Sequence, residues 1–261
     1  MDAPLAVPVL DRFRLDGRTA LVTGASRGLG AAMARALAEA GAEVALHASQ
    51  PLSREARHEL TSGFGARAHL LAADLSHKDS ADQLATDALR ALGRIDILVN
   101  NAGIIRRADA ESYPDEDWDD VLMVDLSSVF RLCRTVGRTM LERGSGKIIN
   151  IASMLTFQGG LRVPACAAAK GGVAQLTKAL ANEWAGRGVN VNAIAPGYMR
   201  TDNTQALRDD RPRYDAITAR IPAGRWGEPD DLAGAVVFLA SSASDYVHGY
   251  VLAVDGGWLA R

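Results

Sequence analysis

The sequence lacks several features that would place it in a specialised class of protein. It has only two cysteines in 261 residues, Cys133 and Cys166. Two are too few for the disulfide framework of a secreted domain, so we expect a reducing, cytoplasmic environment. It also lacks any run of about 18 apolar residues, the length that a membrane-spanning helix needs. We therefore expect no membrane-spanning segment.

An excess of charge is missing as well. The 29 basic and 31 acidic residues nearly cancel, whereas binding to nucleic acid or an anionic membrane favours a basic surface. We expect neither partner, and we assign no metal-binding residues. Residues 1–13 hold Pro4 and Pro8 but no basic stretch before an apolar one. They do not resemble a signal peptide, and residues 1–16 are predicted to form a mobile arm.

The sequence does contain a regular alternation of apolar strand patterns and helical patterns. The predicted strands cover residues 18–23, 43–47, 68–73, 95–99, 147–152, 189–194 and 250–254, and the predicted helices cover residues 28–40, 52–62, 78–92, 115–143, 164–187 and 229–240. Strands that are apolar on both faces and separated by helices indicate a parallel sheet covered on both sides. We predict an α/β fold, a single doubly wound domain over residues 17–261 with seven parallel strands.

The first predicted strand leads into a glycine-rich segment, Thr23-Gly24-Ala25-Ser26-Arg27-Gly28-Leu29-Gly30. Glycines allow the backbone to approach a pyrophosphate, which then lies at the positive end of the following helix. A tight turn without a ligand is the alternative. The strand before and the helix after favour a dinucleotide site.

The preference between NAD and NADP is less clear from the sequence. The second predicted strand ends in His47-Ala48-Ser49-Gln50, without the carboxylate that usually holds a ribose 2′-hydroxyl. The guanidinium of Arg27 could bind a 2′-phosphate, or Arg27 could be a solvated loop charge. The local chemistry favours NADP(H).

A second chemical motif joins the end of a strand to a helix. Ser153 follows the fifth predicted strand, and Pro164 suits the first turn of the next helix. Four residues separate Cys166 from Lys170, so the two side chains lie on one helical face, one turn apart. A hydroxyl facing an ammonium predicts a proton-handling site.

These motifs resemble the classical short-chain dehydrogenase/reductases. The family has a catalytic serine, a tyrosine thirteen residues later and a lysine four further on, with an asparagine on the preceding long helix. Ser153 and Lys170 match that pattern, but Cys166 stands at the tyrosine position and Asp125 at the asparagine position. The resemblance implies Ser153, Cys166, Lys170 and Asp125 as the catalytic set, and Asp125 could pair with Lys170.

The resemblance also assigns cofactor contacts along nearly the whole chain. Asp74-Leu75 resembles the adenine contact, residues 100–103 the nicotinamide side, and residues 196–201 the segment that closes over the nicotinamide. The implied cofactor residues are Gly24, Ser26, Arg27, Gly28, Leu29, Gly30, Ser49, Asp74, Leu75, Asn100, Asn101, Ala102, Gly103, Lys170, Pro196, Gly197, Met199 and Thr201. The C-terminal segments 224–232 and 254–257 match the family pattern and imply a homotetramer.

Within the family, segments 150–164, 192–199, 220–227 and 255–261 are similar to the 2-dehydro-3-deoxy-D-gluconate 5-dehydrogenases. This similarity implies a keto sugar acid as substrate and a substrate loop at about residues 198–225. That group is associated with NAD(H), so NAD and NADP both remain open. The implied substrate residues are Arg106, Arg107, Arg162, Gln158 and Tyr198. Each arginine alone is typical of a surface charge, but one of the three is predicted to hold the carboxylate.

Cys166 leaves two hypotheses for the function. A thiol has a reference pKa of about 8.5 against about 10 for tyrosine, so its acidity is not the obstacle. Its reach is, because cysteine ends about a ring's length short of the tyrosine oxygen. Loss of positioned acid–base catalysis costs about 10²- to 10⁴-fold in rate. The chain is therefore an impaired oxidoreductase or a catalytically inactive dinucleotide-binding subunit.

Overall fold

The computed structural model describes residues 7–64 and 68–261. Its centre is one parallel sheet with the strand order β3-β2-β1-β4-β5-β6-β7. The strands are β1 (Thr19–Val22), β2 (Glu43–Ala48), β3 (Ala68–Ala72), β4 (Ile97–Asn100), β5 (Gly146–Ile151), β6 (Val189–Pro196) and β7 (Val251–Val254). The predicted fold class and strand number are confirmed. The order reverses between β1 and β4, and ligands of such sheets bind outside the carboxyl ends of the strands at that point.

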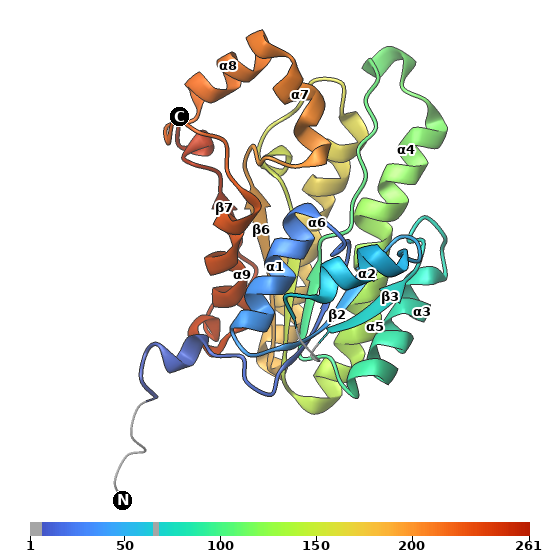
Figure 1. The fold of residues 1–261 in the computed structure, drawn as a ribbon, viewed down its shortest axis with the longest axis vertical. Helices are drawn as coiled ribbons and strands as arrows, with labels where there is room; N and C mark the ends of the chain where they lie inside the picture. The colour runs from blue at the N-terminus through green and yellow to red at the C-terminus, as the bar shows by residue number, and fades with distance from the viewer. Residues whose placement is uncertain (1–6, 65–67) are drawn as a thin grey trace, which may run out of the picture.

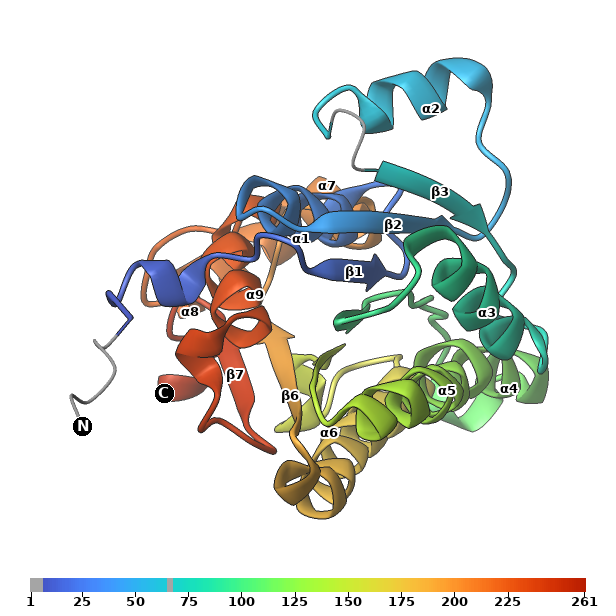
Figure 2. The same ribbon diagram turned by 90° about the horizontal axis from the view of Figure 1, so that it is seen from below.

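Helices cover both faces of the sheet (Figures 1 and 2). One face packs against α1 (Gly28–Glu39) and α9 (Ala233–Ala240). The other packs against α3 (Ser80–Leu92), α5 (Ser128–Arg143) and α6 (Pro164–Trp184). The strands are buried on both sides because their Val, Ile, Leu and Ala side chains meet a helix layer above and below.

Glycines end two of the helices. Gly41 follows the last turn of α1 with a φ of 114°, and Gly93 caps α3 with a φ of 73°. Only glycine takes such values without strain. On α6, Val173, Leu180 and Trp184 form an apolar stripe that is buried in the core.

The single helix predicted over residues 115–143 is wrong in detail. It consists of α4 (Asp115–Leu122), a π-helical turn at Met123–Ser127 and α5. A π turn places an extra residue in the helix, and such turns are frequent at functional sites. The side chain of Asp125 in this turn binds a backbone N–H of another segment. Apolar periodicity carries no signal of that contact, so the sequence did not predict the turn.

The predicted substrate loop contains two helices that the sequence analysis missed. They are α7 (Gln205–Asp209) and α8 (Arg211–Arg220), which stand above the carboxyl ends of the strands (Figure 1). Ile217 is the only buried residue of α8, so the helix has almost no apolar stripe to detect. The helix predicted over 229–240 begins as a 3-10 turn at Pro229–Leu232 and becomes α9 at Ala233.

Part of the predicted N-terminal arm packs against the domain. A 3-10 helix spans Asp11–Phe13, the Phe13 ring lies 6.3 Å from that of Phe238, and Leu15 is buried. The remainder of the predicted arm, residues 1–6, lies outside the described residues. Helix α2 (Arg54–Thr61) lies beyond the β3 edge of the sheet (Figure 2). Across the described ranges, every helix is too short or too polar to cross a membrane.

The close packing of α5 on α6 gives a test of the fold. A Cβ at Gly137 would lie 2.7 Å from ring atoms of Trp184, so Gly137→Ala must displace the indole. We expect a loss of about 1–3 kcal/mol in the free energy of unfolding, measured by urea denaturation. Gly234→Ala on α9 is the control, because its Cβ would meet nothing within 4 Å. An equal effect of the two substitutions would contradict this packing.

Candidate active site

The glycine-rich segment after β1 is fastened to the segment after β4. The Thr23 hydroxyl accepts hydrogen bonds from the backbone N–H groups of Asn101 and Ala102, both at 2.9 Å. Asn101 Nδ2 in turn donates to the carbonyl oxygens of Thr23 and Gly24, at 2.9 and 3.0 Å. These bonds hold two of the predicted cofactor segments in one fixed arrangement at the point where the strand order reverses.

The glycines of this segment allow a backbone conformation and a close packing that other residues could not adopt. Gly24 and Gly28 have φ values of 62° and 56°, and a Cβ at Gly30 would lie 2.2 Å from the carbonyl oxygen of Gly24. Arg27, at the N-cap of α1, forms no side-chain cap. The positive end of this 12-residue helix is therefore open to an anion, as a pyrophosphate site requires.

A buried histidine that the sequence analysis missed supports the segment from below. His47, in β2, accepts a hydrogen bond from the Gly24 N–H at Nδ1 (3.1 Å) and donates from Nε2 to the Ala73 carbonyl (2.8 Å). Burial lowers its pKa, which keeps the ring neutral and fixes that tautomer. A polar residue inside an apolar strand pattern was the available signal.

At the end of β2, where the cofactor ribose is predicted to bind, the chain has no carboxylate. The strand is followed by Ser49 and Gln50, which are both exposed. Arg27 Nη1 lies 3.0 Å from Asp202 Oδ2, and both side chains are exposed. Such a pair contributes little stability and exchanges readily for another anion. Asp74 is exposed after β3, where a hydrogen bond from the Ser76 N–H holds its pKa below the usual range.

Asn100 has an internal side chain. It is buried, and its Nδ2 donates to Asn150 Oδ1 at 2.8 Å and to Cys133 Sγ at 3.2 Å. It thereby ties the end of β4 to β5. Burial raises the pKa of Cys133 to about 12, so this thiol is inert at neutral pH.

Lys170 and Asp125 form a buried ion pair, as the sequence analysis anticipated. Lys170 Nζ lies 3.4 Å from Asp125 Oδ2 and donates to the Ile151 carbonyl at 3.0 Å. Asp125 Oδ1 accepts from the Ile104 N–H at 2.8 Å. The two side chains are 14% and 4% exposed. The pair links α6, the π turn and the segment after β4, and it compensates much of the lysine charge.

Cys166 lies beside this pair in an apolar cluster that includes Val121 and Val163. Its Sγ donates to the Ile104 carbonyl at 3.8 Å. Burial, together with the negative charge of Asp125, raises the pKa of the thiol, and nearby positive charges oppose that only in part. The surroundings therefore make this thiol less acidic than a free cysteine and favour its neutral form.

Burial also raises the pKa of the Asp125 carboxyl, while the Lys170 charge and the Ile104 N–H oppose the rise. Ser153 stands at the end of β5, and its hydroxyl accepts from the Leu155 N–H at 3.1 Å. Within residues 7–64 and 68–261 it forms no hydrogen bond with Cys166 or Lys170. The hydroxyl proton of Ser153 is thus available to a ligand oxygen.

The three arginines that are candidates for the substrate carboxylate differ in their ion-pair partners within the chain. Arg106 pairs with Asp117 at 3.2 Å and Asp120 at 3.8 Å, and Arg162 pairs with Asp109 at 3.0 Å.

Arg107 differs from the other two arginines because, in the described part of the chain, it has no carboxylate partner. Its Nη2 donates to the Asn203 carbonyl at 3.1 Å. Its positive charge also counts among those that oppose the raised pKa of Cys166. Arg107 is therefore both close to the catalytic position and free to bind a substrate carboxylate.

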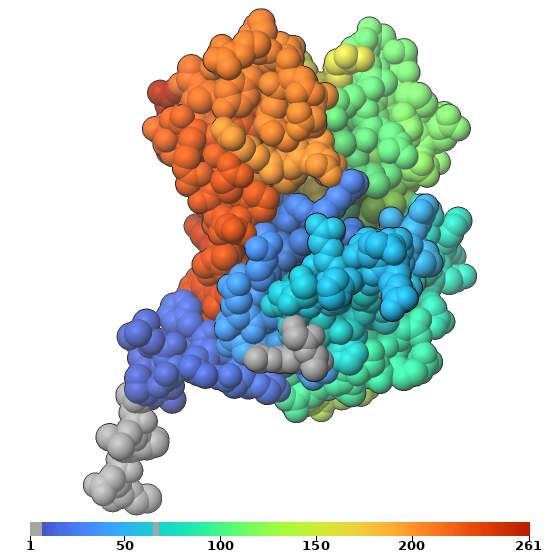
Figure 3. Space-filling view, viewed as in Figure 1, coloured from blue at the N-terminus to red at the C-terminus, as the bar shows by residue number. Residues whose placement is uncertain are grey.

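Tyr198, which follows β6, belongs to a cluster of aromatic side chains. Tyr198 packs on Trp226 and Trp258, with ring centroids 5.2 and 4.7 Å apart. Trp258 Nε1 donates to Gln158 Oε1 at 3.1 Å, which leaves the Gln158 amide protons for another acceptor. In Figure 3 the surface is hollowed between the lobe of α7 and α8 and the lobe of α4.

The remaining predicted residues follow β6. Pro196 ends the strand, and the Gly197 N–H donates to the Val254 carbonyl at 2.9 Å. Met199 is buried, and Thr201 caps a 3-10 turn. These contacts position the backbone that leads into α7.

Tyr113 is a further residue near the site. Its hydroxyl donates to the Arg106 carbonyl at 3.2 Å, and its ring packs against the cluster that contains Cys166. It lies 53 positions away from Cys166 in the sequence, so sequence spacing gave no signal of the contact.

The chain is similar to known proteins over nearly its whole length. The family model described as enoyl-(acyl carrier protein) reductase matches residues 24–259. A 2-dehydro-3-deoxy-D-gluconate 5-dehydrogenase of Dickeya dadantii (strain 3937) is 53% identical over 255 residues, which cover 97% of this chain and all of that protein.

Solved structures are similar over the same length. One from Agrobacterium tumefaciens with bound NADP is 53% identical, with a TM-score of 0.89, and covers 96% of this chain and 99% of its own. A gluconate 5-dehydrogenase from Burkholderia cenocepacia, in complex with NADP and tartrate, is 42% identical, with a TM-score of 0.90. That match covers 97% of this chain and 100% of the other.

The charge of Asp125 should control the reactivity of Cys166. Asp125→Asn removes a negative charge that raises the thiol pKa and leaves the Lys170 charge uncompensated. More thiolate should then be present at a given pH, so we expect iodoacetamide to alkylate Cys166 several-fold faster near pH 8. Mass spectrometry of the modified peptide separates Cys166 from Cys133.

The matched control for this measurement is Asp119→Asn, an exposed carboxylate on α4, which should leave the rate unchanged. A slower or equal rate in Asp125→Asn would show that Asp125 does not set the charge state of the thiol.

Proposed function

The chain belongs to the short-chain dehydrogenase/reductase family, and from that premise we propose that it interconverts a hydroxyl and a ketone on a sugar acid such as 2-dehydro-3-deoxy-D-gluconate. The observation that carries this proposal is the grouping of Ser153 and Lys170 with Arg107, which has no carboxylate partner in the described part of the chain, beside an open glycine-rich segment. A protein that only binds a dinucleotide has no need of these groups.

The residues present fit a nicotinamide dinucleotide. The open N-terminus of α1 suits its pyrophosphate, and the absence of a carboxylate after β2 suits a 2′-phosphate. Arg27 would hold that phosphate after leaving Asp202. These features favour NADP(H) over NAD(H), and the bound dinucleotide accepts or supplies the hydride.

Ser153 and Lys170 then act on the substrate oxygen. The Ser153 hydroxyl donates a hydrogen bond to it and orients the carbon that reacts. The Lys170 ammonium, fixed by Asp125 and the Ile151 carbonyl, stabilises negative charge that develops nearby. The proton must reach the oxygen from Cys166 through a bridging water, because the thiol is short. Its raised pKa favours the neutral thiol, so in the oxidative direction little thiolate is present to accept the proton of the substrate hydroxyl.

Arg107 is the residue we assign to the substrate carboxylate. Arg106 and Arg162 already pair with aspartates, whereas Arg107 donates only to a backbone carbonyl. A guanidinium can grip a carboxylate through two parallel hydrogen bonds. This contact would fix the sugar acid with its reacting carbon near Ser153.

A catalytically inactive subunit is the second candidate, and the state of Cys166 is what favours it. The thiol is buried and kept neutral, and the Lys170 charge is largely compensated by Asp125. Such a subunit would bind the dinucleotide and assemble, as a homotetramer in this proposal, without useful turnover.

Restoring a phenol at position 166 separates the two candidates. We expect Cys166→Tyr to raise kcat on a keto sugar acid at least about tenfold, since positioned acid–base catalysis contributes about 10²–10⁴-fold. Cofactor affinity should change little, because its contacts come from other segments. The measurement is steady-state turnover of a panel of keto sugar acids with NADH and with NADPH.

Asp125→Asn combined with Cys166→Tyr is the companion variant, because Asp125 compensates the charge with which Lys170 would lower the phenol pKa. If the native chain already turns over at tens per second, and Cys166→Tyr slows it, the thiol takes part in a different mechanism. If neither variant turns over but the cofactor binds, the inactive subunit is the better description.

Arg107→Gln tests the substrate assignment. Loss of a charge-assisted hydrogen bond costs about 1.5–3 kcal/mol, so we expect kcat/KM for a sugar acid to fall by roughly 10- to 100-fold, mainly through KM. Arg162→Gln is the matched control and should change KM little, since Arg162 already pairs with Asp109. Equal effects of the two substitutions would remove Arg107 from the substrate site. The assay uses the more active of the native chain and Cys166→Tyr.

A further inference from the structure

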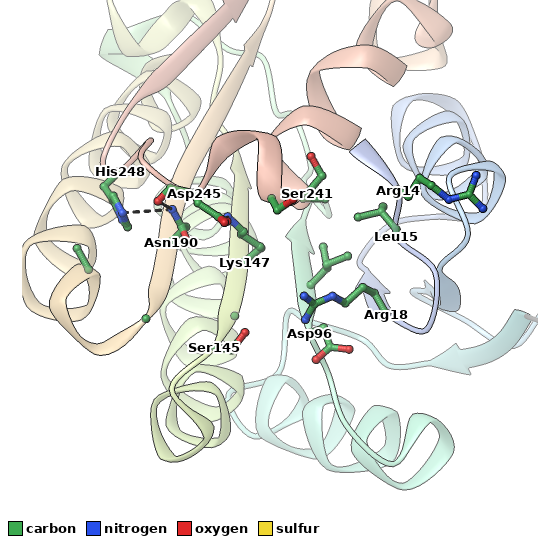
Figure 4. Close-up of a pocket in the computed structure, with 16 residues that line it drawn as sticks. Arg14, Leu15, Arg18, Asp96, Ser145, Lys147, Asn190, Ser241, Asp245 and His248 are labelled. Carbon is green, nitrogen blue, oxygen red and sulfur yellow. Dashed lines mark hydrogen bonds and ion pairs between the residues drawn. The ribbon is translucent and has the colours of Figure 1, made fainter. Parts of the chain in front are cut away.

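A polar cavity of about 350 Å³ lies at the amino-terminal edge of the sheet, away from Ser153 and Lys170 (Figure 4). The segment before β1, the starts of β4, β5 and β6, and the turn after α9 line it. None of the residues assigned above to cofactor or substrate lines it. Two of its side chains, Arg18 and Lys147, enter the cavity from the segment before β1 and from β5 (Figure 4).

Lys147 has donors to spare in this cavity. Its side chain is 14% exposed, and its ammonium donates to Asp245 Oδ1 at 2.7 Å. Within the described ranges this is its only partner, although an ammonium has three protons to donate. Asp245 is itself 68% exposed. Burial lowers the pKa of Lys147, the hydrogen bond and charge of Asp245 oppose that, and the positive charge of Arg18 lowers the pKa to a smaller extent.

Arg18 is free on the same cavity wall. Its guanidinium forms no hydrogen bond or ion pair with any residue of the described chain, so its five N–H donors are all available. The other charged residues that line the cavity are engaged: Arg14 pairs with Asp16, and Asp96 pairs with Arg94 and Arg143.

His248 lines the end of the cavity away from Arg18, beyond Asn190 (Figure 4). Asn190 Nδ2 donates toward the carbonyls of Ser244, Asp245 and Val247, which fixes its identity as the nitrogen. That nitrogen also lies 3.3 Å from His248 Nε2. The buried Nδ1 of His248 has no hydrogen-bond partner among the described residues. Because the ring lies away from Arg18, it is not counted with the two cations.

Arg18 and Lys147 thus offer unused cationic donors to the cavity, which the carboxylates of Asp96 and Asp245 also line. A dianionic phosphate offers several acceptor oxygens to such a set and relieves the repulsion between Arg18 and Lys147. We propose that this cavity is a second ligand site that binds the phosphate group of a small metabolite through Arg18 and Lys147. The site is separate from the catalytic one and does not depend on the proposed oxidoreductase activity.

The test is a calorimetric titration of inorganic phosphate into the full chain, with and without saturating NADPH, at constant ionic strength. We expect millimolar-class binding to the native chain in both conditions. Arg18→Gln should weaken it at least about fivefold, which matches loss of one charge-assisted contact. Because Arg18 is exposed, this variant should fold normally. Arg35→Gln, an exposed arginine on α1, is the matched control and should bind phosphate as the native chain does.

Lys147→Gln should weaken phosphate binding in the same way. The proposal is overturned if the native chain does not bind phosphate at tens of millimolar, or if Arg18→Gln binds it as tightly as the native chain. It is also overturned if phosphate competes with NADPH or with the sugar acid, since the anion would then occupy the catalytic site. Tighter binding of citrate than of phosphate would overturn the assignment of a phosphate ligand.

Discussion

The hydrogen bonds between Thr23 and Asn101 join the segments that follow β1 and β4, and the arrangement of the catalytic edge depends on them. Two neighbouring parallel strands end there, and their connections lead to opposite faces of the sheet. The side-chain bonds satisfy backbone groups that would otherwise be unpaired. His47 supports the same segment from β2, so three strands position the glycine-rich backbone. A cofactor therefore meets a preformed surface.

The buried pair of Asp125 and Lys170 is the second constraint on this edge. A buried ion pair gains little net stability, because each charge loses its hydration, but removal of one partner is costly. Here the pair also fixes the segment after β4 through the Ile104 N–H. Its electrostatic consequence reaches Cys166, whose thiol is kept neutral by burial and by the carboxylate. Both positions at which this chain departs from the family pattern, 125 and 166, thus affect the thiol proton of Cys166.

The ion pairs around the site determine which arginine can still bind a ligand. Arg106 and Arg162 are committed to carboxylates of the chain, while Arg107 is not. The same reasoning applies at the opposite edge of the sheet, where Arg14 and Asp96 are paired and Arg18 is not. In both places, the informative groups are those whose hydrogen-bonding capacity the protein itself leaves unused.

The sequence determined the fold class, the seven parallel strands and the position of most helices, because apolar periodicity and glycine caps act locally. It also singled out Ser153, position 166 and Lys170 as candidate catalytic residues, since a fixed spacing on a strand end and a helix face constrains where the side chains lie. Tertiary structure alone decided the π turn at Asp125, the helices of the substrate loop and the raised pKa of Cys166. It also separated Arg107 from Arg106 and Arg162. These properties depend on burial and on partners far away in the chain, which residue spacing does not encode.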